Sequence, residues 1–130
     1  MTPLRRGFAT LLVALSASAG GARAEVYDPQ IDDTKAICAA FFVAVAGSGT
    51  VDDKTAQELT EIASVLAAPR PTLSAYMKQE LTNLRRGLEI QFRSSFVTDP
   101  DDRYSGREEL RETCVDFARA RPETRGLVPD

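Results

Sequence analysis

The segment from Ala36 to Ala46 contains no polar residue, and this run constrains the fold more than any other part of the chain. Four of its apolar residues recur at the i, i+3, i+4, i+7 spacing of one helical face: Cys38, Phe41, Phe42 and Val45. The other positions are apolar as well, so a helix here must be covered on most of its sides. We therefore expect it to be the central helix of its domain, or to face a partner.

Three further segments have apolar residues at helical spacing, and no segment reads as a convincing strand. Proline, glycine and capping residues separate these segments. The expected helices run from Asp28 or Asp33 to Ala46, from Val51 (capped by Thr50) to Ala67, from Leu73 to Phe96, and from a capping box at Ser105 and Glu108 to Pro122. The pattern predicts an all-α fold, a small four-helix bundle or similar helical array, with a loose tail from about residue 122.

The first 24 residues have the pattern of a secretory signal peptide. Arg5-Arg6 precedes an apolar run from Phe8 to Ala19, and Ala22-Arg23-Ala24 is an A-x-A cleavage site. The run is shorter than the roughly 20 residues that a membrane span requires. We expect cleavage after Ala24, or alternatively after Ala19, which leaves residues 25–130 as a single helical domain without a transmembrane segment. The protein is then periplasmic or secreted.

Charge argues against nucleic acid as a partner. The formal net charge is −3, and loss of Arg5, Arg6 and Arg23 with the leader takes it to −6. General attraction to nucleic acid or to anionic lipid requires a basic face. The acidic balance therefore favours a protein or a small molecule as the partner.

Two cysteines remain in the expected mature chain, and they favour a structural disulfide. Cys38 and Cys114 lie on the apolar stripes of the first and last expected helices, and an exported protein with two cysteines usually pairs them. They lack the C-x-x-C spacing of redox pairs. Two distant sulfurs in a chain without histidine make neither a standard zinc site nor a covalent haem site, so we expect no metal and no cofactor.

The absence of histidine also argues against an enzyme. It removes the commonest general base and every Ser-His-Asp or Cys-His arrangement. Carboxylate pairs remain at Glu58 with Glu61 and at Glu108 with Glu112, each on one helical face. Such pairs on amphipathic helices are usually solvated surface, so we assign no catalytic residue.

Basic residues of the third expected helix form a candidate partner surface. Arg85 and Arg93 each lie four residues from Glu89, and Arg86 is adjacent. This spacing is typical of an ion-paired solvent face. Arginine is also enriched where carboxylates or proteins are recognised, so Arg85, Arg86 and Arg93 are the residues through which we expect a partner to bind.

Small size, one disulfide and the missing catalytic groups favour an exported, non-catalytic protein-binding or accessory module. An inhibitor, an immunity protein and a chaperone all belong to this class. We expect its partner to be another exported or envelope protein, and self-association is possible within this class.

Two alternatives stay open. The helices could enclose a pocket for a small apolar ligand, although the aromatic residues that would line it more often form plain core: Phe41, Phe42, Phe92 and Phe96. The helical build with one long-range disulfide also resembles the periplasmic acid-stress chaperones, although no motif matches residue by residue. That resemblance implies a chaperone activated when acid protonates its carboxylates and loosens the bundle.

Overall fold

The computed structural model describes residues 26–129, so the expected leader and its cleavage sites lie outside the described residues. Within residues 26–129 the regular secondary structure consists of helices joined by loops, without strands, which confirms the all-α prediction. The elements are α1 (Pro29–Ala46), α2 (Asp53–Leu66), α3 (Ala75–Thr98), α4 (Arg107–Ala120) and the short 3-10 helix η3 (Arg125–Leu127).

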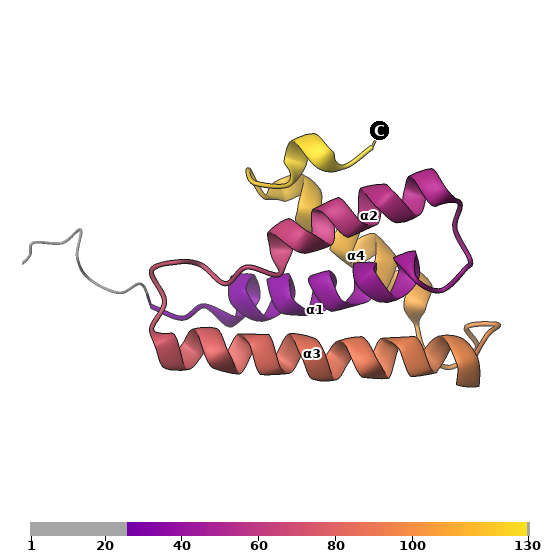
Figure 1. Ribbon diagram of the computed structural model, residues 1–130, viewed down its shortest axis with the longest axis horizontal. Coiled ribbons are helices and arrows are strands. Elements are labelled where there is room, and N and C mark those ends of the chain that lie inside the picture. The colour runs from indigo at the N-terminus through magenta and orange to yellow at the C-terminus, as the bar shows by residue number, and fades with distance from the viewer. Residues whose placement is uncertain (1–25, 130) are drawn as a thin grey trace, which may run out of the picture.

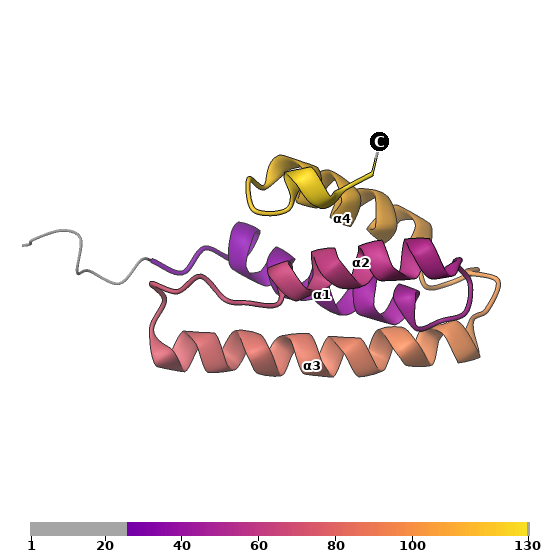
Figure 2. The same ribbon diagram turned by 45° about the horizontal axis from the view of Figure 1, so that its top comes forward.

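Helix α1 is the central element. It lies between α3 on one side and α2 on the other, and α4 crosses on the side away from α3 (Figures 1 and 2). Its apolar run is buried almost throughout, and the residues that complete the core come from α2 and α4: Ile62, Ala63, Leu66, Cys114 and Ala118. The expectation of a central helix is confirmed.

The start of α1 agrees with the sequence expectation, whereas the start of α2 differs from it. Helix α1 begins at Pro29 because the Asp28 carboxylate accepts the Gln30 N–H at 3.0 Å, which is the first of the two expected starts. Helix α2 is capped by Asp52 and not by Thr50, because the Asp52 carboxylate accepts a first-turn N–H at 2.8 Å. The Thr50 hydroxyl instead lies 2.7 Å from that of Ser48.

The expected capping box at the start of α4 is wrong. The Ser105 hydroxyl donates to the Asp99 carboxylate at 2.5 Å, so it is not available to cap the helix. The N-cap residue is Gly106, which has a left-handed backbone with φ of 67°. The Asp102 carboxylate instead accepts the first two N–H groups of α4, at 2.9 and 3.1 Å.

The connection between α3 and α4 is tightly hydrogen-bonded. The Asp99 carboxylate also accepts three backbone N–H groups, and the hydrogen bond from Ser105 together with these lowers the pKa of Asp99 to about 2. The Arg107 guanidinium donates to the backbone oxygens of Ser95 and Asp99 and lies 4.3 Å from the centre of the Phe96 ring. These contacts fix where α4 begins relative to the end of α3.

The disulfide prediction is confirmed. Cys38 of α1 and Cys114 of α4 are bonded, with their Cα atoms 5.3 Å apart and both side chains buried. Cys114 and Ala118 are the fully buried residues of α4, and Leu110, Val115 and Phe117 pack against the core beside them.

The segment after Pro122 is packed, which corrects the expectation of a loose tail. Thr124 is fully buried, and its hydroxyl donates to the Ala118 carbonyl oxygen at 2.7 Å. Helix η3 contacts both α2 and α4. In the sequence this segment has no helical apolar pattern, and nothing local marks the one threonine that anchors it.

Helix α3 continues through Gly87 without a break (Figure 1). Gly87 is exposed and has open space where a Cβ would lie, so nothing in the fold requires glycine there. The left-handed backbone of Gly106, in contrast, disfavours any other residue.

Substitution of these two glycines by alanine should shift stability in opposite directions. We expect Gly87→Ala to raise the free energy of unfolding by about 0.5–1 kcal/mol, because alanine is the better residue in a helix interior. Gly106→Ala should lower it by about 1–2 kcal/mol, because a Cβ is strained in the left-handed region. Urea denaturation followed by circular dichroism measures both, and a destabilised Gly87→Ala variant would contradict the open surroundings of Gly87.

Candidate functional site

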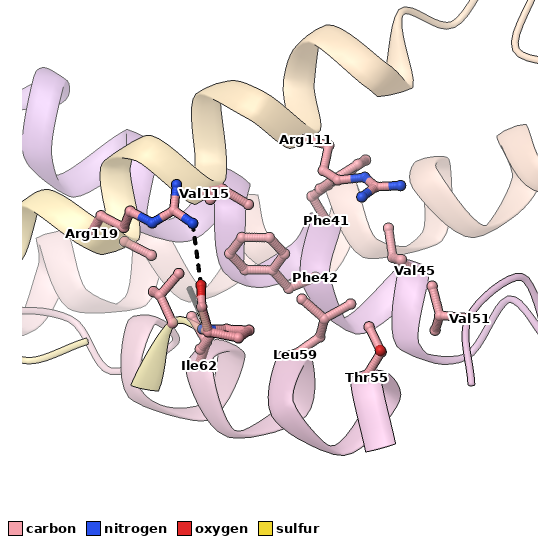
Figure 3. A pocket seen from close by; sticks show the side chains of 13 residues that line it. Phe41, Phe42, Val45, Val51, Thr55, Leu59, Ile62, Arg111, Val115 and Arg119 are labelled. Atoms are coloured by element: carbon pink, nitrogen blue, oxygen red, sulfur yellow. Dashed lines mark hydrogen bonds between the residues drawn. The ribbon is translucent and has the colours of Figure 1, made fainter. Parts of the chain in front are cut away.

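The described part of the chain contains an apolar hollow between α2 and α4, with α1 as its floor (Figure 3). Its volume is about 270 Å³. The residues that line it come from α1, the start and middle of α2, α4 and the C-terminal segment: Phe41, Phe42, Val45, Val51, Thr55, Leu59, Ile62, Arg111, Val115, Ala118, Arg119, Val128 and Pro129. We call this hollow, together with its extension described below, the α2–α4 groove.

Two of the four aromatic residues predicted to line a pocket form the floor of the groove. Phe41 and Phe42 are both buried, with ring centres 6.2 Å apart. Phe92 packs edge-on against the Phe41 ring at 5.5 Å and supports it from α3. Phe92 therefore acts as core and does not line the groove, whereas Phe96 lines its extension.

A second hollow of about 230 Å³ continues the first along α4 towards the α3–α4 connection. The two share Phe41, Val45 and Arg111, so they form one continuous groove. The second hollow is more polar, since Arg107, Glu108 and Asp102 line it together with Phe96. The groove thus changes from apolar to mixed along its length.

The α4 rim of the first hollow is basic. Arg111, Val115 and Arg119 follow one another at four-residue spacing along this rim (Figure 3). Of the described residues that line this hollow, these two arginines are the charged ones. Arg111 lies 3.9 Å from Glu108, and Arg119 donates to the Pro129 carbonyl oxygen at 3.2 Å, which ties the C-terminal segment across one end.

The arginines predicted as a partner surface lie on α3, away from the groove. Arg93 and Arg85 both pair with Glu89, at 2.9 and 3.7 Å, so the structure joins them through one carboxylate. Arg86 is exposed beside them. The ion-paired face expected for this helix is present, and its use by a partner stays a prediction.

A buried ion pair joins the start of α1 to the α2–α3 connection. The Asp32 side chain is only 1% exposed and accepts two hydrogen bonds from the Arg70 guanidinium, at 2.8 and 2.7 Å. Arg70 also donates to the Val26 carbonyl oxygen at 3.0 Å. The Arg70 hydrogen bonds hold the pKa of the Asp32 carboxyl below its usual range, against the opposing effect of burial.

Lys35 is, after Asp32, the second buried charged residue at the start of α1. Burial lowers the pKa of the Lys35 ammonium, and the Glu123 carboxylate 3.9 Å away opposes this shift. Glu123 belongs to the C-terminal segment, so this pair links that segment to α1. Together with the Asp32 pair, it anchors both ends of the described chain to the central helix.

Across residues 26–129 no three ligand-type side chains cluster in a way that could hold a metal ion. Glu61, Glu108 and Glu112 are exposed, as expected for solvated carboxylates. No helix in the same range is long and apolar enough to cross a membrane.

The sequence interpretation missed the two groove arginines and the buried pair of Asp32 with Arg70. The spacing of Arg111, Val115 and Arg119 was a usable signal, because an apolar residue flanked by two arginines lies on one helical face. Asp32 and Arg70 are 38 residues apart and carry no local signal.

No protein-family model matches the chain, and no curated protein or solved structure is significantly similar to it.

Acid should destabilise the fold partly through Asp32. Its pKa is lower in the folded protein than in the unfolded chain, so the pair stabilises above about pH 5 and this stability is lost as pH falls below the usual aspartate value of 3.8. We expect Asp32→Asn to lower the free energy of unfolding at pH 7 by about 2–4 kcal/mol. The stability of the Asp32→Asn variant should also decline less steeply than that of the unmodified protein between pH 5 and about pH 2.

Urea denaturation over this pH range measures both effects, with Asp101→Asn in the exposed α3–α4 connection as the matched control. The control should follow the unmodified protein. An Asp32→Asn variant with an unchanged acid slope would show that the ion pair does not contribute to pH-dependent stability.

Proposed function

We propose that this protein is a non-catalytic binding module that holds a segment of a partner protein in the α2–α4 groove. The observation that carries the proposal is the groove itself, an open apolar hollow with a buried aromatic floor and a charged rim. Hot spots of protein interfaces have this composition, in which an anchor side chain enters an apolar pocket and polar groups surround it.

The shape of the groove favours a protein segment over a free small molecule. The apolar hollow of about 270 Å³ adjoins a second, more polar hollow of about 230 Å³ further along α4. An elongated occupant such as a polypeptide fits two hollows in line better than a single compact ligand does. One or two apolar side chains of a polypeptide would fill the first hollow while the main chain continues along the second.

The disulfide supports a location outside the cytoplasm. Disulfides persist in oxidising compartments, and the Cys38–Cys114 bond joins two buried side chains. Together with the signal-peptide pattern of residues 1–24, it favours the periplasm or the exterior. The partner is then an exported or envelope protein, and an inhibitor, immunity or chaperone role fits this module.

A matched pair of substitutions on α2 tests the proposal. Thr55 lines the groove, whereas Thr60 lies on the exposed face of the same helix. We expect Thr55→Phe to fill the groove and reduce capture of the partner at least about tenfold, which corresponds to about 1.4 kcal/mol. Thr60→Phe should capture the partner as the unmodified protein does. Affinity capture from the native cell-envelope extract with quantitative mass spectrometry measures both.

Urea denaturation should first show that the two variants are equally folded, since both substitutions are at partly or fully exposed positions. A partner captured equally by Thr55→Phe and Thr60→Phe would bind elsewhere, and the α3 arginines would then be the next surface to test.

A small apolar-ligand carrier is the second candidate function. The observation that favours it is that, within the described part of the chain, only Arg111, Arg119 and Thr55 bring polar side chains to the first hollow. Native mass spectrometry of protein purified from its own host should show a bound mass below about 1 kDa if this candidate is correct. That mass should be absent from the Thr55→Phe variant and present in Thr60→Phe.

A further inference from the structure

The charges around the first hollow indicate the chemistry of the partner segment. From them, and resting on the proposed function, we infer that the segment is extended and places an acidic residue, a large apolar residue and a second acidic residue at alternate positions. The apolar side chain enters the hollow, and the two carboxylates meet Arg111 and Arg119.

The charge distribution is the first observation that supports this inference. The chain as a whole has a net charge of −3, yet among residues 26–129 both charged side chains that line the hollow are arginines. Guanidinium groups bind carboxylates in a bidentate geometry that ammonium groups cannot reproduce. A basic rim on an acidic protein selects for an acidic segment and against a basic one.

The spacing of the arginines is the second observation. Arg111 and Arg119 are eight residues apart on one face of α4, with Val115 between them. Eight residues of helix span about 12 Å. In an extended chain, residues four apart are about 13 Å apart and point to the same side, as does the residue midway between them. The distance between the two arginines therefore matches the distance between two acidic residues that are four apart in the extended segment. The apolar residue midway between those two acidic residues then faces the hollow.

The present partners of the two arginines are weak enough to be exchanged. Arg111 lies 3.9 Å from Glu108, and their side chains are 54% and 70% exposed. Such an exposed pair contributes little free energy. Arg119 has one hydrogen bond to a backbone carbonyl oxygen, that of Pro129. Glu112 and Asp116 lie with these arginines on the outer side of α4 and do not line the groove.

Three synthetic peptides that differ only in charge test the inference. They have the sequence Ser-X-Ser-Phe-Ser-X-Ser with blocked ends, where X is Glu, Gln or Lys. Titration into the ¹⁵N-labelled, disulfide-bonded protein at low salt, followed by NMR, gives each affinity and the site from the shifted amides. We expect the Glu peptide to bind about fivefold more tightly than the Gln peptide and the Lys peptide to bind most weakly. The shifted amides should be those around Val115 and Phe42.

A double variant, Arg111→Gln with Arg119→Gln, should bind the Glu and Gln peptides equally. The matched control is Arg103→Gln with Arg125→Gln, because both residues are exposed and neither lines the groove. This control should retain the preference for the Glu peptide, because it also loses two positive charges but loses them outside the groove.

Equal binding of all three peptides in the groove would overturn the acidic pattern and leave the proposed function standing. A preference for the Glu peptide that the control variant loses as well would overturn the assignment to Arg111 and Arg119. Absence of binding by every peptide, together with shifts of the same amides by decanoate, would overturn the peptide as occupant and support the ligand carrier. Capture of a partner sensitive to Thr55→Phe tests the proposed function separately.

Discussion

The disulfide between Cys38 and Cys114 is the interaction on which the arrangement of the helices depends. Helices α2 and α3 both pack along the apolar sides of α1, whereas α4 contributes two fully buried residues to the core, of which one is Cys114. A covalent bond at the centre of so small a contact fixes α4 against α1. Closing a long loop in this way stabilises a domain by about 2–5 kcal/mol. For a chain of this length, that is a large share of the total stability.

The candidate site follows from this constraint. One wall of the groove is α4, its floor is the aromatic face of α1 one turn beyond Cys38, and its far wall is α2, so the separation of the two walls is set by where the disulfide holds α4. The Arg107 contacts with the end of α3 and the packing of Thr124 under the C-terminal segment hold the two ends of α4 in addition. A binding groove between two helices needs walls that keep their distance, and these three attachments provide it.

The sequence was sufficient for the architecture and less so for the site. The apolar run of α1, the helical spacing elsewhere and the cysteine pair predicted an all-α array linked by a disulfide, because these signals are local or depend on a residue type with one dominant use. The true caps, Asp52 and Asp102, were missed because several polar residues compete at each helix start. The sequence named the phenylalanines of the groove floor as pocket candidates, but the groove itself could not be predicted, because a hollow depends on how far apart α2 and α4 lie. Asp32 and Arg70 were missed because a buried ion pair between distant residues has no sequence pattern.

The most direct test of this account is hydrogen exchange, measured by mass spectrometry on the oxidised protein and on a variant in which both Cys38 and Cys114 are alanine. The account predicts that the variant keeps slow exchange in α1, α2 and α3 and loses most of the protection of α4, because the bond joins this helix to α1 at the centre of their contact. Equal protection of α4 in the two proteins would contradict the claim that the disulfide positions this helix and the groove that it borders.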